Sequence, residues 1–275
     1  MVASVSPSEI ERRAGSLAVS LRGVTKVYDN GVMALGPLDL DVAEGEFVSL
    51  LGPSGCGKST ALRLIAGLNA PTSGTVGVAN RAGQARTGHS IGHGIGFVFQ
   101  EPTLMPWSSV RENVRLPLKL AHAPAAEANA RVDEALIHVG LAEFAEAYPR
   151  ELSGGMKMRV SLARALVTDP DILLMDEPFA ALDEITRFRL NNDLLALWRD
   201  LRKTVIFVTH SVFESVYLSQ RVIVMTPRPG RIEAEFRIDA AEPRAEDFRT
   251  SANYAGYCRQ VSNALTPLHQ GLSGS

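Results

Sequence analysis

Short apolar runs alternate along the chain with segments of helical spacing, and this alternation predicts most of the elements. Strand-like runs occur early, in LAVSLRGV, LGPLDLDV and EFVSLLG, and two more, DILLM and TVIFVTH, follow residue 170. The last two contain short apolar runs, ILLM and VIFV, which are typical of buried parallel strands. Helical patterns run from Lys58 to Gly67 and from Glu184 to about Leu201. Strands that alternate with helices predict a layered α/β core.

Weaker patterns divide the rest of the chain. We predict a flexible lead at 1–16, a surface loop at 80–94 and a buried strand in IGFVFQ. An alanine-rich helical insert is expected at 110 to about 148, broken by Pro117 and Pro124.

The last part of the chain and one histidine pair carry less information. Little pattern follows Arg231, and GLSGS at the end has the composition of a disordered terminus. His89 and His93 lie four residues apart, but the glycines around them favour a plain loop over a metal site.

Composition is that of an ordinary soluble chain. The 275 residues are 45% apolar and 21% charged, enough for one large domain or two small ones. A net charge of −2 gives no basic surface for nucleic acid. Cys56 and Cys258 cannot form a disulfide framework, which indicates a reducing compartment. Since no secretory leader and no run of about 18 apolar residues is present, work at a membrane would require a partner.

The segment GPSGCGKST joins the third strand to the helix that follows. Its spacing matches G-x-x-x-x-G-K-[ST], in which glycines let backbone N–H groups surround phosphate oxygens at a helix start. Lys58 would supply charge to the β and γ phosphates, Ser59 would ligate Mg²⁺ and Thr60 would bond the α phosphate. Cys56 has no catalytic role in this interpretation. The predicted phosphate-binding residues are Gly52, Pro53, Ser54, Gly55, Cys56, Gly57, Lys58, Ser59 and Thr60.

Two carboxylates follow the apolar run DILLM. Asp176 would lie at the carboxyl end of a strand, where open α/β sheets bind their ligands, and could hold Mg²⁺. Glu177 suits a base that orients or deprotonates a water attacking the γ phosphate. The alternative is structural: Asp176 would cap a helix and Glu177 would be solvated. The phosphate-binding motif in the same chain favours the catalytic interpretation.

Together the motifs resemble the ATP-binding cassette (ABC) ATPases over roughly Leu17 to Ile232. The family signature corresponds to LSGGM at 152–156, the acidic strand to ILLMDEP and a dimer-contact loop to ALD at 181–183. FVFQEP matches the glutamine loop, and VTHS matches the switch-histidine segment. The resemblance implies a P-loop NTPase core with an antiparallel β subdomain and a helical signature subdomain.

The resemblance also implies boundaries and roles. The ATPase domain would span 17–236, with the helical subdomain at about 101–168 and a partly helical extension with a flexible end at 237–275. Glu177, His210 and Gln100 would serve catalysis, Tyr28 would stack on adenine, and the metal ligands would be Ser59, Gln100 and Asp176. ATP and Mg²⁺ are the implied cofactors.

In this family two copies pack head to tail, so each nucleotide lies between them. Ser153, Gly154 and Gly155 of one copy would then close over the γ phosphate held by the other, at a helix start that favours negative charge. Met156 and Met158 stand where many relatives have Gln, which leaves any polar contact from those positions in doubt.

Several stretches, including LMPWSSVRENVRLPL and PRPGRI, look most like importer ATPases of the nitrate, sulfonate and taurine group. The expected assembly is a homodimer with two permease subunits at the cytoplasmic face of the inner membrane, served indirectly by a solute-binding protein. TLMPWSSV would contact the permease. The alternatives are an ABC exporter ATPase, a soluble ABC protein of repair or translation, and a P-loop kinase that would leave LSGGM unexplained. The solute is not encoded in any motif.

Overall fold

The computed structural model describes residues 16–79, 85–86, 94–240, 244 and 246–270. The predicted lead apart from Ser16, the GLSGS end, and the pair His89 and His93 lie outside these residues. Most of the loop predicted at 80–94 also lies outside them, but Ala85–Arg86 forms a short strand, β5, which pairs with Ser73–Ala79, β4. The loop prediction is therefore wrong at these two positions.

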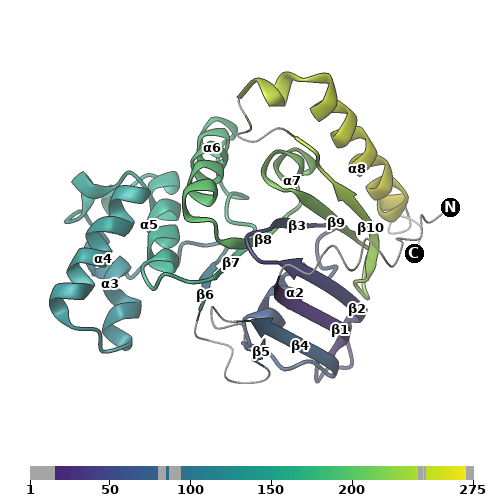
Figure 1. Ribbon diagram of the computed structural model, residues 1–275, viewed down its shortest axis with the longest axis horizontal. Helices are drawn as coiled ribbons and strands as arrows, with labels where there is room; N and C mark the ends of the chain where they lie inside the picture. Colours follow the sequence, from purple (N-terminus) through teal and green to yellow (C-terminus); the bar gives the residue numbers. More distant parts are fainter. Residues whose placement is uncertain (1–15, 80–84, 87–93, 241–243, 245, 271–275) are drawn as a thin grey trace.

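A six-stranded sheet of order β10-β9-β3-β8-β7-β6 forms the centre of the molecule (Figure 1). All neighbours are parallel except β10, which is antiparallel to β9. The strands are β3 (Phe47–Leu51), β6 (Ile95–Val98), β7 (Ile172–Asp176), β8 (Thr204–Thr209), β9 (Arg221–Met225) and β10 (Ile232–Arg237). The predicted α/β class is confirmed.

Residues of β3 alternate between two apolar cores, as the period of a strand requires. Phe47 and Leu51 face the larger core, whereas Val48 and Leu50 face the smaller one. Both faces of β3 are covered, so every residue of this strand is buried. This explains why EFVSLLG reads as an almost continuous apolar run.

A four-stranded antiparallel sheet, of order β2-β1-β4-β5, packs over the smaller core. Its long strands are β1 (Leu17–Val27) and β2 (Met33–Ala43). Helix α2 (Lys58–Ile65) lies between this sheet and the central one, and its buried face includes Leu62 and Ile65 (Figure 1).

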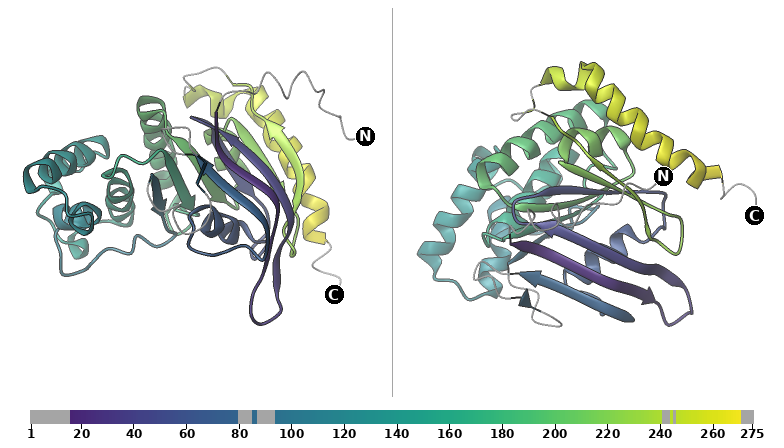
Figure 2. Two further views of the ribbon diagram at one scale, coloured as in Figure 1. Left: turned by 60° about the horizontal axis from the view of Figure 1, so that its bottom comes forward. Right: turned by 45° about the vertical axis from the view of Figure 1, so that its right-hand side comes forward.

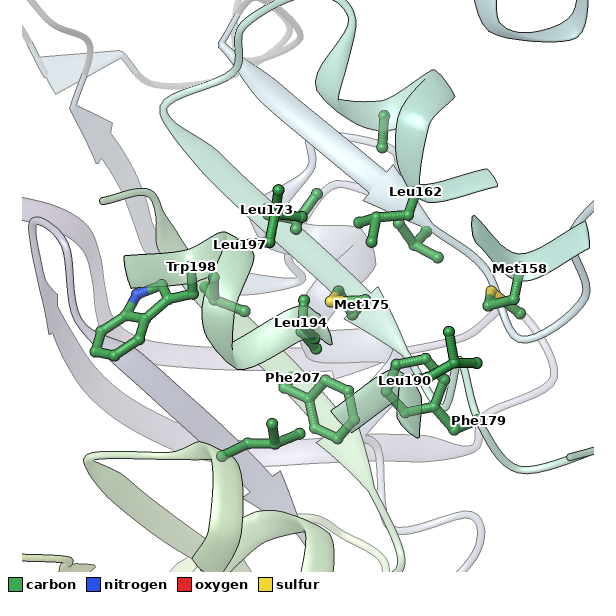
Figure 3. Close-up of a cluster of buried hydrophobic side chains, with 14 of the residues drawn as sticks. Met158, Leu162, Leu173, Met175, Phe179, Leu190, Leu194, Leu197, Trp198 and Phe207 are labelled. Carbon is green, nitrogen blue, oxygen red and sulfur yellow. The ribbon is translucent and has the colours of Figure 1, made fainter. Parts of the chain in front are cut away.

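The other face of the central sheet is covered by helices α6 (Glu184–Leu201), α7 (Val212–Leu218) and α8 (Ala252–Gln270) (Figures 1 and 2). Phe207 of β8 packs here on Phe47 and Phe179, with ring centroids 6.1 and 5.8 Å apart. Leu194 and Trp198 of α6 lie over the same strands (Figure 3). This core holds the ends of β7 and β8 in place.

A group of helices leaves the core between β6 and β7 and forms the lobe on the left of Figure 1. It contains α3 (Val110–Leu120), α4 (Ala125–His138), the short turns η2 (Ala142–Phe144) and η3 (Pro149–Glu151), and α5 (Gly154–Leu166). Pro124 precedes α4 as predicted, but Pro117 lies inside α3. Val114 and Leu118 are buried on either side of this proline, so packing outweighs its poor helix propensity.

The C-terminal part is more ordered than its weak pattern indicated. The short turn η4 (Glu246–Thr250) leads into α8, which is 19 residues long. Val261 is fully buried, and Tyr254 and Cys258 are buried beside it against the larger core.

Candidate active site

The loop at 52–60 wraps around the start of α2 at the carboxyl end of β3. Gly57 has φ 101°, and a Cβ at this position would lie 2.6 Å from Leu35 and 2.7 Å from the Ala34 carbonyl. Only glycine fits there without strain. The loop at 52–60, called the cradle below, therefore has a backbone path that a side chain at position 57 would disrupt. Backbone N–H groups at such a helix start are suited to bind an anion.

Lys58 is drawn into this loop and is only 4% exposed. Its ammonium group donates to the carbonyls of Gly52 at 2.8 Å and Pro53 at 3.0 Å. Cys56 is buried beside it, and burial raises the pKa of the Cys56 thiol. A positive charge is therefore held at the centre of the cradle by the same backbone that forms its walls.

Ser59 and Asp176 meet at the point where α2 begins and β7 ends. The Ser59 hydroxyl donates to Asp176 Oδ1 at 2.7 Å. Burial raises the pKa of Asp176, and the neighbouring charge of Glu177 adds to this effect, whereas the bond from Ser59 opposes it. A hydroxyl and a carboxylate so placed are oxygen ligands of the kind Mg²⁺ prefers. The donor set therefore fits the ion that the sequence predicts.

Glu177 stands between the cradle and His210. Its backbone has φ 47°, a region that non-glycine residues seldom adopt and that often occurs at functional sites. Its N–H donates to the Val208 carbonyl of β8 at 3.0 Å, which fixes this turn to the sheet. Oε1 lies 3.7 Å from Lys58 Nζ, and Oε2 lies 3.2 Å from Nδ1 of His210.

His210 follows the last residue of β8 and is half-exposed. Because β8 lies between β3 and β7 in the sheet, its end is brought beside both the loop at 52–60 and the acidic pair. Ser211 caps α7 by accepting a hydrogen bond from the Glu214 N–H at 3.3 Å. The structure thus brings Lys58, Ser59, Asp176, Glu177 and His210 together from three neighbouring strands.

Tyr28 and Gln100 lie at the edges of this group. The Tyr28 hydroxyl is 3.2 Å from Thr60 Oγ1, so the aromatic ring lies beside the phosphate loop, with Lys26 over it. Gln100 is exposed two residues beyond β6, the strand that pairs with β7. Adjacent parallel strands end at the same edge of the sheet, which places Gln100 on the side of Asp176.

The signature residues lie elsewhere. Ser153 is the N-cap of α5, where its hydroxyl accepts a hydrogen bond from the Met156 N–H at 3.3 Å. Ser153 and Gly154 are exposed, while Gly155 is buried so closely that a Cβ would lie 2.7 Å from Thr186. Helix α5 belongs to the helical lobe, away from α2 (Figures 1 and 2). Within one chain, therefore, the signature does not join the cradle.

Sequence reasoning missed the pair Arg187 and Glu214, which lies beneath the His210 segment. Glu214 is buried, and its Oε1 lies 3.6 Å from Arg187 Nε. Both side chains stand at ordinary helical positions, where charged residues are normally solvated. The position of Glu214, four residues after His210, was the only sequence feature that connected it to the site. That spacing does not predict that Glu214 contacts a residue of α6.

The family model described as ABC transporter matches residues 35–180, more than half of the chain. The chain belongs to the ABC transporter family. It is similar to an uncharacterised ABC transporter ATP-binding protein of Methanocaldococcus jannaschii, with 47% identity over 90% of this chain and 91% of that protein. It is also similar to the taurine import ATP-binding protein of Rhizobium johnstonii, with 48% identity over 80% of this chain and 82% of that protein.

Solved structures give the same family. An ATP-binding cassette in a dimeric, post-hydrolysis state with ADP and Pi is 36% identical, with a TM-score of 0.69, over 81% of this chain and all of that chain. A Clostridium perfringens cassette, part of an ABC transporter complex, is 28% identical with a TM-score of 0.72 over 81% of this chain and 89% of that chain. The protein is therefore an ABC ATPase that binds and hydrolyses ATP, as its motifs predicted.

Proposed function

We propose that this ABC ATPase is the energising subunit of an importer for a small solute of the nitrate, sulfonate or taurine kind. The observation that carries this proposal is the likeness to taurine import ATP-binding proteins of three bacteria, at 45–48% identity over 77–82% of this chain. The sequence stretches LMPWSSVRENVRLPL and PRPGRI support the same group.

Roles for the site residues follow from their geometry. Backbone N–H groups of residues 52–60 and the Lys58 ammonium bind the phosphates of ATP. Glu177 accepts a proton from the water that attacks the γ phosphorus as the bond to ADP breaks. His210 holds the Glu177 carboxylate from the other side, and Tyr28 and Gln100 complete the pocket around the base and the attacking water.

Mg²⁺ would be held by Ser59 and Asp176, with Gln100 as the third protein ligand. When bound, the ion neutralises charge on the β and γ phosphates. The chain supplies an oriented hydroxyl and a carboxylate that already lie within hydrogen-bond distance of each other.

The exposed signature residues point to a second copy of the chain. The start of α5 presents Ser153 and backbone N–H groups to solvent, where a γ phosphate on the neighbour would be bound. The solved relative with ADP and Pi is dimeric. ATP then joins two copies and its hydrolysis releases them, a change of state driven by contacts that exist only with ATP bound.

The permease would dock beside the glutamine loop, at the cytoplasmic face of the inner membrane. Trp107 is 75% exposed and Met105 is partly exposed in TLMPWSSV, and both residue types suit partner contacts. No helix in the described part of the chain is long and apolar enough to cross a membrane. In the proposed assembly two permease subunits provide the path for the solute, and a solute-binding protein delivers it to them.

Uptake in a strain that lacks this gene tests the proposal. We expect loss of uptake of labelled taurine, an alkanesulfonate or nitrate, restored by the unaltered gene but not by the Glu177→Gln variant. Normal uptake of all three, or faster accumulation of a compound that the parent strain expels, would contradict an import role.

A further inference from the structure

The pair of Glu214, which is buried, and Arg187, which is partly exposed, lies where α6 meets α7. Arg187 Nε faces Glu214 Oε1 at 3.6 Å, and neither atom has a hydrogen-bond partner among the described residues. Burial raises the pKa of Glu214, while the Thr209 hydroxyl and the charge of Arg187 counteract this rise. A buried carboxylate thus faces a partly exposed guanidinium, close to the reacting groups but outside the set that would touch ATP.

The carboxylate of Glu214 fixes the backbone on both sides of His210. Its second oxygen, Oε2, accepts a hydrogen bond from the Thr209 hydroxyl at 2.5 Å. That hydroxyl in turn accepts from the Ser211 N–H at 3.0 Å. His210 stands between these two residues, so its position depends on where Glu214 lies.

The guanidinium of Arg187 reaches in the opposite direction. Its Nη2 donates to the Leu182 carbonyl at 2.9 Å, within the loop at 181–183. Leu182 and Thr186 lie close to the signature residues. A Cβ at Gly154 would lie 3.3 Å from Leu182, and one at Gly155 would lie 2.7 Å from Thr186. Arg187 therefore ties the pair to the surface that a second copy would contact.

We propose that Arg187 and Glu214 are positioning residues that connect two parts of one chain. The first part is the signature with the 181–183 loop, which contacts the ATP held by the neighbouring copy. The second part is His210, which acts on the ATP held by its own chain. This inference rests on the proposed roles of His210 and Glu177 and on the shared site. An ion pair with one buried and one partly exposed partner contributes little net stability compared with apolar residues of similar size, so what this pair provides is geometry. Small misplacements of reacting groups have large effects on turnover.

The test compares ATP turnover, ATP affinity and thermal midpoint in four variants of the full chain. Glu214→Gln keeps an acceptor for Thr209 but loses the charge, and Arg187→Met loses both contacts. Arg187→Lys retains the charge but lacks the planar guanidinium group, which contacts both the Leu182 carbonyl and Glu214. Arg189→Met, on the exposed side of the same helix, is the matched control.

We expect Glu214→Gln to lower kcat by about 10- to 100-fold with an almost unchanged KM for ATP and a similar thermal midpoint. Arg187→Met should lower kcat over the same range but should also lower the thermal midpoint, because it leaves the buried Glu214 carboxylate without its counter-charge. Arg187→Lys should recover part of the loss, and Arg189→Met should match the unaltered protein. Normal kcat in Glu214→Gln and Arg187→Met would overturn the inference. A parallel decrease of kcat, ATP affinity and thermal midpoint in Glu214→Gln would also overturn the inference, because it would indicate a purely structural role.

Two further variants separate this inference from the roles on which it rests. If Glu177→Gln and His210→Ala hydrolyse ATP normally, the proposed site assignments fail. If both are inactive while the Arg187 and Glu214 variants are normal, the assignments stand and only the connection is refuted.

Discussion

Replacing Glu177 with Gln is expected to lower ATP turnover by about 10²- to 10⁴-fold while ATP still binds. The amide keeps the size of the side chain but cannot accept a proton from water. The residue does not contribute to the walls of the cradle, which are backbone and Lys58, so phosphate binding should survive. With hydrolysis blocked, ATP should hold two copies together, and the variant should accumulate as a dimer.

Single-turnover hydrolysis, nucleotide binding and size-exclusion chromatography with ATP measure the three parts of this prediction. Glu143→Gln, an exposed carboxylate in η2, provides the control and should behave like the unaltered protein. Near-normal hydrolysis by Glu177→Gln would show that another group orients the water.

Replacing Lys58 with Ala should weaken ATP binding or its productive placement by about 2–5 kcal/mol, which is roughly 30-fold or more. The ammonium group is buried and bonded to the Gly52 and Pro53 carbonyls, so its loss removes the one buried positive charge of the described loop and leaves two carbonyls without that donor. Solvent cannot replace this charge at the same place.

Equilibrium binding of a fluorescent ATP analogue and the rate of phosphate release measure this effect. Lys119→Ala, at the exposed end of α3, is the matched control. If Lys58→Ala retained both full affinity and full rate, the loop at 52–60 would not be the phosphate site.

The parts of this molecule that sequence reveals are those whose cause is local. The apolar runs of β3, β7 and β8 are buried on both faces, so periodicity and burial agree. The phosphate loop can be recognised because Gly57 needs a backbone that only glycine tolerates there. The position of Asp176 at the end of β7 could be predicted because the apolar run before it ends there.

The parts that sequence conceals depend on contacts between distant segments. Pro117 remains helical because α3 packs on α5, and this packing cannot be predicted from local helix propensity. Helix α8 did carry a signal, since Tyr254, Cys258, Val261 and Leu265 recur at helical spacing, but its polar surroundings masked it. The meeting of Arg187 with Glu214 required the fold itself, because the two residues lie 27 positions apart on different helices.

The account as a whole depends on the idea that each ATP is bound by two copies of this chain. The most direct measurement mixes Lys58→Ala protein, whose cradle is defective, with Ser153→Arg protein, whose signature is defective. Each alone should be inactive, but a mixed dimer contains one intact cradle facing one intact signature, so mixing should restore ATP hydrolysis. Normal hydrolysis by Ser153→Arg alone, or no recovery from a mixture in which mixed dimers are shown to form, would contradict the account.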